Sequence, residues 1–277
     1  MSKPSKQYAR ALTIATSDSG GGAGVQADLK AFSAMGCYGM SVFAALTAQN
    51  TTDVTGIHAL PPDFVSLQID TVIEDLGVDA VKIGMLFNSE IMEAVADRLA
   101  AHNVGNVVLD PVMVAKSGAK LIQDDAIETL KTQLFPLSTN ITPNLPEAET
   151  LLDIKIDDRT QMEGAARKLL DFGPDSVLLK GGHFSDKKSI DCLVLGEKDV
   201  NGKDVYWYEA ERIHTKNTHG TGCTLSSAIA AGLAKGEPLP EAVQSAKKYI
   251  SGAIESGSEY SIGNGHGPLH HFYQWWE

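Results

Sequence analysis

Short apolar segments alternate with amphipathic helical segments along most of this chain, and this alternation constrains its fold more than any other feature. Residues 80–84 and 107–109 are typical of buried strands, and residues 89–101 between them carry apolar side chains at helical spacing. Strands that alternate with helices in this way form a parallel sheet covered by helices on both faces. The sequence therefore predicts an α/β fold, with ligands at the carboxyl ends of the strands.

The other segments extend this pattern over the chain, apart from one interruption. Residues 191–195 and 205–208 flank an Asn201-Gly202 turn and are predicted to pair as antiparallel strands. No internal repeat, linker or low-complexity segment divides the sequence, so one domain covering residues 1–277 is expected. Further strands are expected at residues 8–16, 41–46, 138–142 and 176–180, a short extended excursion at 53–60, and further helices at residues 25–32, 63–76, 125–134, 160–172, 225–234 and 240–254.

Composition excludes several classes of function. The 277 residues carry a formal net charge of −12, which argues against a general nucleic-acid binder or a protein attracted to anionic membranes. The cysteines Cys37, Cys192 and Cys223 are far apart in sequence, so neither a disulfide framework nor a zinc site is predicted. Residues 1–6 lack the apolar core of a signal peptide, and no apolar run reaches the ~20 residues of a membrane span. We therefore expect a cytoplasmic protein without nucleic-acid or membrane partners.

A glycine-rich loop at residues 216–224 runs directly into a helix of small residues. Gly220 and Gly222 allow the backbone N–H groups at the helix start to point outward together, which predicts an anion hole for a phosphate. Cys223 falls in the first turn, where the helix dipole is expected to shift a thiol toward thiolate. The alternative interpretation is a glycine loop before a core helix that contains a small buried cysteine.

A second glycine run follows the first predicted strand and matches the pattern G-x-G-x-x-A at Gly22, Gly24 and Ala27. A dinucleotide site would also need an acidic residue about 20 positions later for the ribose hydroxyl, and apolar residues stand there. No P-loop pattern G-x-x-x-x-G-K-[ST] is present either. A nucleotide that binds this chain is therefore expected to be held by neither of these two motifs.

Polar residues follow several of the predicted strands, at the edge of the sheet where a ligand is expected. Asp110, Asn144 and Glu147 offer oxygen ligands of the kind that suits Mg²⁺, and Lys180 places a cation at the same edge. Structural interpretations stay open for each of them, such as an Asp-Pro turn at Asp110 and a Pro-started helix with an acid in its first turn. Asp18 and Asp28 are likewise open to interpretation as a turn residue and a solvated helix acid, and Gln49 as a solvated amide.

Taken together, these motifs resemble the hydroxymethylpyrimidine/phosphomethylpyrimidine kinases of thiamine biosynthesis, which are members of the ribokinase-like superfamily. The similarity covers nearly the whole chain. The motifs that carry it occur in order at residues 17–30 (SDSGGGAGVQADLK), 82–86 (KIGML), 110–113 (DPVM), 142–147 (TPNLPE), 180–183 (KGGH), 217–224 (NTHGTGCT) and 267–276 (GPLHHFYQWW).

The resemblance implies a ribokinase-like three-layer α/β sandwich, ATP as phosphate donor, Mg²⁺ as cofactor, and a homodimer. It also implies two successive phosphorylations of 4-amino-5-hydroxymethyl-2-methylpyrimidine. The implied site residues are Asp28, Gln49, Ala23, Met85 and Val112 for the pyrimidine, Asn144, Lys180 and Thr215 for the nucleotide, Asp110 and Glu147 for the metal, and Gly220, Gly222 and Cys223 for the anion hole and catalytic position.

Two positions depart from related sequences. Thr16 stands where the family usually has Gly, which crowds the loop after the first strand. Cys223 stands where the wider superfamily usually has an Asp acting as base. The second acceptor would be a phosphate monoester with nearly two negative charges at pH 7, which a carboxylate would repel and a neutral thiol would not. Two alternatives remain at this point: a pyridoxal kinase of the same lineage and a non-catalytic pyrimidine-binding sensor.

Overall fold

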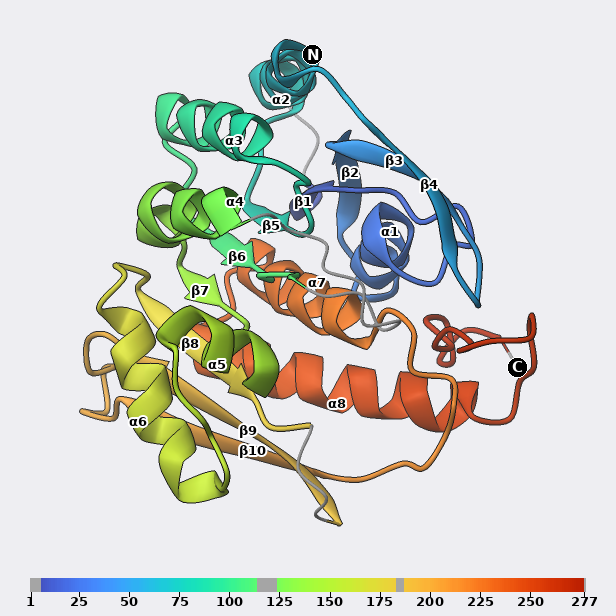
Figure 1. Ribbon diagram of the computed structural model, residues 1–277, viewed down its shortest axis with the longest axis vertical. Coiled ribbons are helices and arrows are strands. Elements are labelled where there is room, and N and C mark those ends of the chain that lie inside the picture. Colours follow the sequence, from blue (N-terminus) through green and yellow to red (C-terminus); the bar gives the residue numbers. More distant parts are fainter. Residues whose placement is uncertain (1–5, 114–123, 183–186, 277) are drawn as a thin grey trace.

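The computed structural model describes residues 6–113, 124–182 and 187–276, so His183 of the KGGH motif lies outside the described residues. Its centre is an eight-stranded sheet (Figure 1). The strands lie in the order β10 (Val205–Glu211), β9 (Lys188–Leu195), β8 (Ser176–Lys180), β7 (Asn140–Ile141), β6 (Val107–Leu109), β5 (Ala80–Ile83), β1 (Arg10–Ala15) and β2 (Tyr38–Phe43). The strands from β8 to β2 pair in parallel, whereas β9 and β10 pair antiparallel. The predicted mostly parallel sheet and its antiparallel interruption are confirmed.

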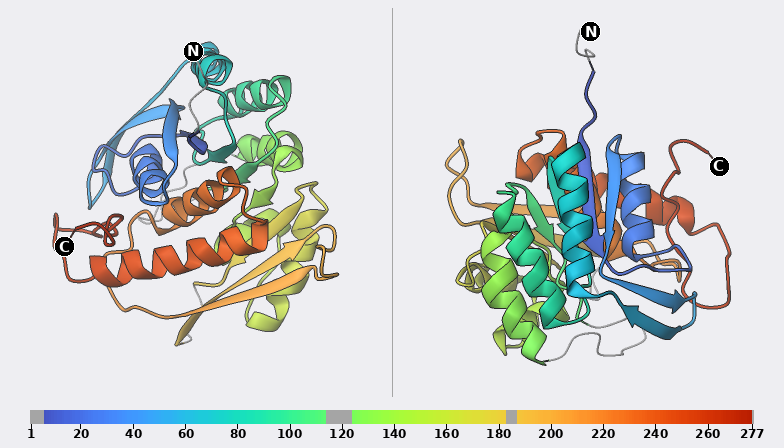
Figure 2. Two further views of the ribbon diagram at one scale, coloured as in Figure 1. Left: turned by 180° about the vertical axis from the view of Figure 1, so that it is seen from behind. Right: turned by 90° about the horizontal axis from the view of Figure 1, so that it is seen from above.

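Helices cover both faces of the sheet, as predicted (Figure 2). One face is covered by α1 (Gly24–Ala34), α7 (Thr221–Ala234) and α8 (Leu239–Gly257). The other is covered by α2 (Pro62–Leu76), α3 (Ser89–Ala101), α4 (Asp124–Thr129) with the turns η1 (Leu130–Leu134) and η2 (Phe135–Leu137), α5 (Leu145–Leu152) and α6 (Arg159–Leu170). Successive strand residues point to opposite faces, so Ala11 and Leu12 enter different apolar clusters. The central layer therefore has a hydrophobic core on each side.

The predicted strand at residues 41–46 is wrong in one respect, because the chain changes sheet within it. β2 ends at Phe43, and β3 (Ala45–Gln49) pairs antiparallel with β4 (Val54–Ala59) in a separate hairpin. The pairing of β2 with β1 ends at Ala15, where the chain turns into the glycine run, so the following residues need another partner. This hairpin projects beyond the carboxyl ends of the parallel strands, where ligands are expected (Figure 2, right).

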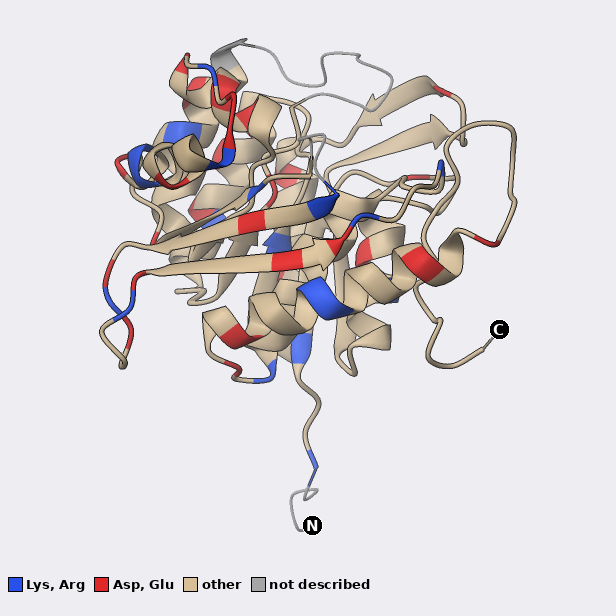
Figure 3. Ribbon diagram, turned by 90° about the horizontal axis from the view of Figure 1, so that it is seen from below, with Lys and Arg blue, Asp and Glu red and all other residues tan. Residues whose placement is uncertain are grey.

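Charged residues of both signs are interspersed on the side shown in Figure 3, including β9 and β10. Lys188 on β9 lies 3.0 Å from Glu209 on β10, which in turn lies 3.1 Å from Arg159. Over the described ranges, the search for a helix that is both long and apolar enough to span a bilayer finds none.

Candidate active site

A cavity of about 210 Å³ opens at the carboxyl ends of the parallel strands, between the β3–β4 hairpin and the start of α7. A volume of this size holds a small ring or a phosphate group rather than a macromolecule. The predicted site residues that line it are Ala23, Gln49, Met85, Asp110, Val112, Asn144, Glu147, Lys180, Gly220, Gly222 and Cys223. Residues that are distant in the sequence therefore meet in one place, as the sheet topology leads one to expect.

The start of α7 has backbone geometry that only glycine allows. Gly220 precedes the helix with φ 82°, and a Cβ there would lie 1.8 Å from the carbonyl oxygen of Gly22. A Cβ at Gly222 would lie 3.2 Å from Asp110 Oδ2 and 3.4 Å from Lys180 Nζ. The first-turn N–H groups have no partner within the helix, and the helix dipole adds partial positive charge beside them. This end of α7 has the features of an anion hole.

Cys223 lies at this helix start, but its predicted shift toward thiolate is wrong. Burial raises the pKa of the Cys223 thiol to about 11, although the Lys82 ammonium and the N–H of Gly24 oppose that rise. The carboxylates of Asp28 and Asp110 raise it further. Desolvation therefore outweighs the helix dipole, and the thiol stays neutral at pH 7.

Asp110 and Lys180 form a buried ion pair beside Gly222. Lys180 Nζ lies 2.7 Å from Asp110 Oδ1, which also accepts a hydrogen bond from the Thr142 hydroxyl at 3.1 Å. Burial alone would lower the pKa of Lys180, but Asp110 and Glu147 outweigh it, and the pKa is raised. Lys180 therefore carries a fixed positive charge at the wall of the cavity.

Asn144 and Glu147 are joined in a capping box at the start of α5. The N–H of Glu147 donates to Asn144 Oδ1 at 2.9 Å, and the N–H of Asn144 donates to Glu147 Oε2 at 2.8 Å. Burial and the nearby Asp110 carboxylate raise the pKa of Glu147 to about 7, although Lys180 opposes the shift. The structural interpretation of Glu147 as a first-turn acid is thus correct, and its carboxyl group also lines the cavity.

The oxygen donors at this side of the cavity fit Mg²⁺. Within the described ranges no group of three or more His, Cys, Asp and Glu side chains converges as a metal site. Mg²⁺ does not need one, because it keeps most of its waters and is held through one or two carboxylates together with substrate phosphates. Asp110 and Glu147 supply two such carboxylates beside the anion hole.

Asp18 organises the glycine loop. Its carboxylate accepts hydrogen bonds from the N–H groups of Gly20, Gly22 and Ala23 and from His219 Nε2, at 2.8–3.0 Å. Burial alone would raise the pKa of Asp18, but these hydrogen bonds, with His219 the strongest, lower it. The interpretation of Asp18 as a turn residue is supported. Its bond to His219 also ties this loop to the one that precedes α7.

The structure does not bring Asp28 or Thr215 into the lining of this cavity. Asp28 is fully buried beneath it, and its carboxylate accepts hydrogen bonds from Thr13 and Ser227 and two from Lys82 Nζ, at 2.9 and 3.0 Å. Asp28 is therefore no solvated helix acid, and its side chain pairs with Lys82 below the lining of the cavity. The Thr215 hydroxyl accepts a hydrogen bond from the N–H of Asn217 at 3.1 Å.

Sequence reasoning missed several lining residues, and two of them, Lys82 and His219, carry polar side chains that bear on the chemistry of the site. The sequence does contain a signal for Lys82, because it stands in the middle of a short apolar strand. A lysine buried at such a position needs a charged or polar partner. A signal for His219 is weaker, since only its place beside Gly220 singles it out. His219 Nε2 lies 3.4 Å from the side-chain nitrogen of Gln49, so a helix-start residue and a hairpin residue meet at the cavity.

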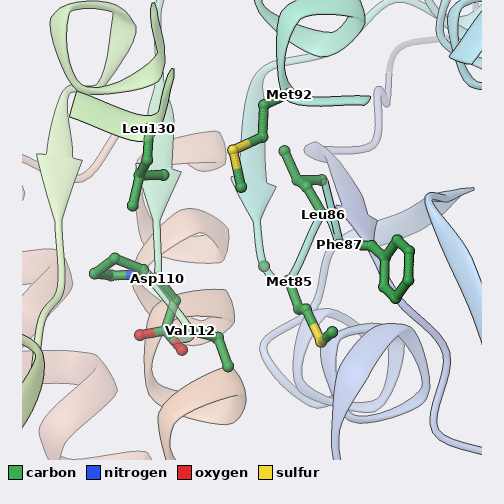
Figure 4. Close-up of a pocket in the computed structure, with 9 residues that line it drawn as sticks. Met85, Leu86, Phe87, Met92, Asp110, Val112 and Leu130 are labelled. Atoms are coloured by element: carbon green, nitrogen blue, oxygen red, sulfur yellow. The ribbon is translucent and has the colours of Figure 1, made fainter. Parts of the chain in front are cut away.

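Met85 and Val112 form an apolar wall next to Asp110. Figure 4 shows Met85 after β5 and Val112 after β6, with Met92 and Leu130 at the other end of an adjoining hollow of about 10 Å³. That hollow has room for about one water. Thr16 donates its hydroxyl to the Met85 carbonyl at 2.9 Å and thereby holds this wall in place.

Comparisons with known proteins match nearly the whole of this chain. The model of the phosphomethylpyrimidine kinase family matches residues 18–270. A hydroxymethylpyrimidine/phosphomethylpyrimidine kinase of Salmonella typhimurium is 50% identical over 272 residues, which cover 98% of this chain and 100% of that protein. The match to that enzyme runs from end to end, so it includes every part of the cavity.

Two solved structures have the same fold. A phosphomethylpyrimidine kinase from Clostridium difficile has a TM-score of 0.78 at 44% identity, covering 88% of this chain and 99% of that one. An ADP complex of Bacillus subtilis pyridoxal kinase has a TM-score of 0.85 at 36% identity, covering 96% and 98%. The fold is thus shared by both kinds of kinase, whereas sequence identity is higher to the pyrimidine kinases.

Proposed function

This chain belongs to the phosphomethylpyrimidine kinase family, and we propose on that basis that it phosphorylates 4-amino-5-hydroxymethyl-2-methylpyrimidine and then its monophosphate, with ATP as donor. Within the structure, the observation that supports this proposal is the anion hole at the start of α7, where Gly222 lies beside the Lys180 ammonium and the buried Cys223 thiol is neutral. The hydroxyl of the first acceptor and the charged phosphate of the second can both approach a neutral group. A kinase in the thiamine pathway needs both steps to reach the diphosphate.

The nucleotide is proposed to lie on the side formed by α5 and the end of β8. Lys180 supplies a cation for the phosphates of the nucleotide. Asn144 lies at the start of α5, where its side chain is hydrogen-bonded to the N–H of Glu147. Mg²⁺, held through Asp110 and Glu147, would neutralise charge on the transferred phosphoryl group. Asp110 also accepts a hydrogen bond from the Lys180 ammonium at 2.7 Å, so this carboxylate orients that cation.

The acceptor is proposed to lie on the side formed by the hairpin and the loops after β5 and β6. Met85 and Val112 offer an apolar wall to the pyrimidine ring, and the Gln49 amide can both donate to and accept from the edge of that ring. The reacting oxygen would then face Cys223, and the N–H groups near Gly220 and Gly222 would stabilise the charge that spreads during transfer. Positioning and charge stabilisation are the main demands of this reaction.

A pyridoxal kinase of the same lineage is the second candidate, and the likeness to the Bacillus subtilis enzyme supports it. The decisive assay compares ADP release with the hydroxymethyl pyrimidine, its monophosphate and pyridoxal. We expect both pyrimidines to be turned over with the higher kcat/KM. A kcat/KM for pyridoxal more than tenfold above that for the pyrimidines would overturn the proposal. Binding of the pyrimidine without any turnover would favour a non-catalytic pyrimidine-binding sensor.

The family resemblance further leads us to propose a homodimer in the cytoplasm, with ATP and the pyrimidine as partners and neither nucleic acid nor membrane among them. Sedimentation equilibrium tests the oligomeric state, and fractionation of cells tests the location. A mass that corresponds to one chain of 29.5 kDa would contradict the dimer.

A further inference from the structure

Residues 263–268, here called the C-terminal strap, touch the turn of the β3–β4 hairpin and the loop before α7, which are far apart in the sequence. After α8 the chain runs toward the tip of the β3–β4 hairpin, as the red tail in Figures 1 and 2 shows. There it contacts the turn of that hairpin at Thr51 and the loop before α7 at His219. Neither contact has a role in the function proposed above.

The strap is bound to the hairpin turn through Thr51. The N–H of His266 donates to the Thr51 carbonyl at 2.9 Å, and the N–H of Gly265 donates to the Thr51 hydroxyl at 3.2 Å. A Cβ at Gly265 would lie 1.8 Å from the Thr51 carbonyl oxygen and 3.0 Å from Thr52 Cα. These are backbone atoms, so no side-chain rotation relieves the clash. Only glycine allows the strap to lie this close to the turn.

The other end of the strap is bound to the loop before α7. The N–H of His219 donates to the Gly267 carbonyl at 3.0 Å, and a Cβ at Gly267 would lie 2.1 Å from Asn217 Oδ1. Asn217 is itself fixed, since its Nδ2 donates to the carbonyls of Gly257 and Tyr260, each at 2.7 Å. The strap therefore rests on a rigid loop that leads directly into the anion hole.

The geometry points to Gly265 and Thr51 as positioning residues: the strap fixes the hairpin turn against the loop before α7 and thereby holds Gln49 beside His219 in the wall of the cavity. Gln49 lies two residues before Thr51, and its side-chain nitrogen lies 3.4 Å from His219 Nε2. Both line the acceptor side of the cavity. The inference rests on the proposed function, which places the acceptor on this side of the cavity.

Gly265→Ala tests the inference, with Gly105→Ala as the matched control because a Cβ at Gly105 has no heavy atom within 4 Å among the described residues. Calorimetry on the purified protein measures the Kd of the acceptor and of ATP separately. We expect Gly265→Ala to raise the acceptor Kd about tenfold or more, because small displacements at a binding site are costly, and to change the ATP Kd less than about twofold. Gly105→Ala should change neither.

Thr51→Val serves as the second variant in case Gly265→Ala folds poorly. It keeps the side-chain volume but removes the hydroxyl that accepts from Gly265, so we expect a rise of about threefold in the acceptor KM with kcat nearly unchanged. The assay uses whichever acceptor the wild type phosphorylates fastest, so a failure of the pyrimidine as substrate overturns only the proposed function. An unchanged acceptor KM in Thr51→Val, or equal losses of acceptor and ATP affinity in Gly265→Ala, would overturn the strap's positioning role.

Discussion

Replacing Cys223 by Asp should separate the two phosphorylation steps. The variant places a carboxylate at the start of α7, where the wild type has a neutral thiol. The first acceptor presents an uncharged hydroxyl, and an aspartate can take its proton, as at the corresponding position of the wider superfamily. The second acceptor presents a phosphate monoester with nearly two negative charges, which the new carboxylate repels. We therefore expect the first step to be largely preserved and the second to be slowed.

The size of the effect follows from the surroundings of position 223. Two unit charges about 4 Å apart cost about 4 kcal/mol at an effective dielectric constant of about 20. The Lys82 ammonium, which opposes the rise in the pKa of the Cys223 thiol, offsets part of that repulsion. A remaining cost of about 2.7 kcal/mol corresponds to a loss of about 100-fold in the rate of the second step.

Single-turnover phosphorylation of each acceptor, measured at several pH values, gives the two rates separately. Cys223→Asn is the matched control, because asparagine has the shape of aspartate without its charge. It should not show the selective loss, and Cys223→Ala should slow both steps. Equal losses for the two acceptors in the Asp variant would refute the charge argument. Full activity of Cys223→Ala would show that Cys223 is only a small buried residue of the helix and has no part in catalysis.

Three further perturbations test separate parts of the site. Glu147→Gln should raise the Mg²⁺ requirement and lower turnover with pyrimidine affinity nearly intact, and an equal loss of affinity and rate in calorimetry and kinetics would remove Glu147 from the metal role. Gln49→Leu should weaken pyrimidine binding by about 1–3 kcal/mol, because ring nitrogens lose their partner, while ATP affinity measured by calorimetry stays the same. Burial, helped by Lys30, lowers the pKa of His271 to about 4. The folded state therefore takes up a proton less readily than the unfolded state. The free energy of unfolding should fall by roughly 3 kcal/mol as the pH drops from about 6.5 to about 4. Urea unfolding of His271→Gln should lack that slope, and an unchanged slope would show that another group causes it.

The parallel sheet was predictable because its strands are short, apolar and separated by amphipathic helices, a pattern that is local in sequence. The hairpin was not, because nothing in residues 41–49 marks the point at which the chain leaves one sheet for another. That point is set by β1, whose pairing with β2 stops at Ala15. Strand partners of this kind are decided by tertiary structure, so propensity alone cannot find them.

The site was predictable in its outline because polar residues follow the parallel strands, whose carboxyl ends must meet at one edge. The pair of Asp28 and Lys82 could not be assigned, although both are charged residues within apolar patterns. Each needs a partner when buried, but only the fold shows that they are partners of each other. Asp28 thereby lies below the cavity, paired with Lys82.

The thiol of Cys223 shows a second kind of limit. The rule that a helix start lowers the pKa of a cysteine is local, whereas burial depends on everything packed around the side chain. Here burial dominates and the pKa rises to about 11. Sequence gives the position of such a group, and structure gives its protonation state.

The central claim is that one cavity performs two successive phosphoryl transfers to a pyrimidine. Its most direct test is to incubate the enzyme with the hydroxymethyl pyrimidine, Mg²⁺ and excess ATP, and to follow products and ADP over time by chromatography. We expect the monophosphate to appear first and to be converted to the diphosphate, with two ADP formed per pyrimidine. A reaction that stops at the monophosphate after one ADP, with added monophosphate left unchanged, would contradict it.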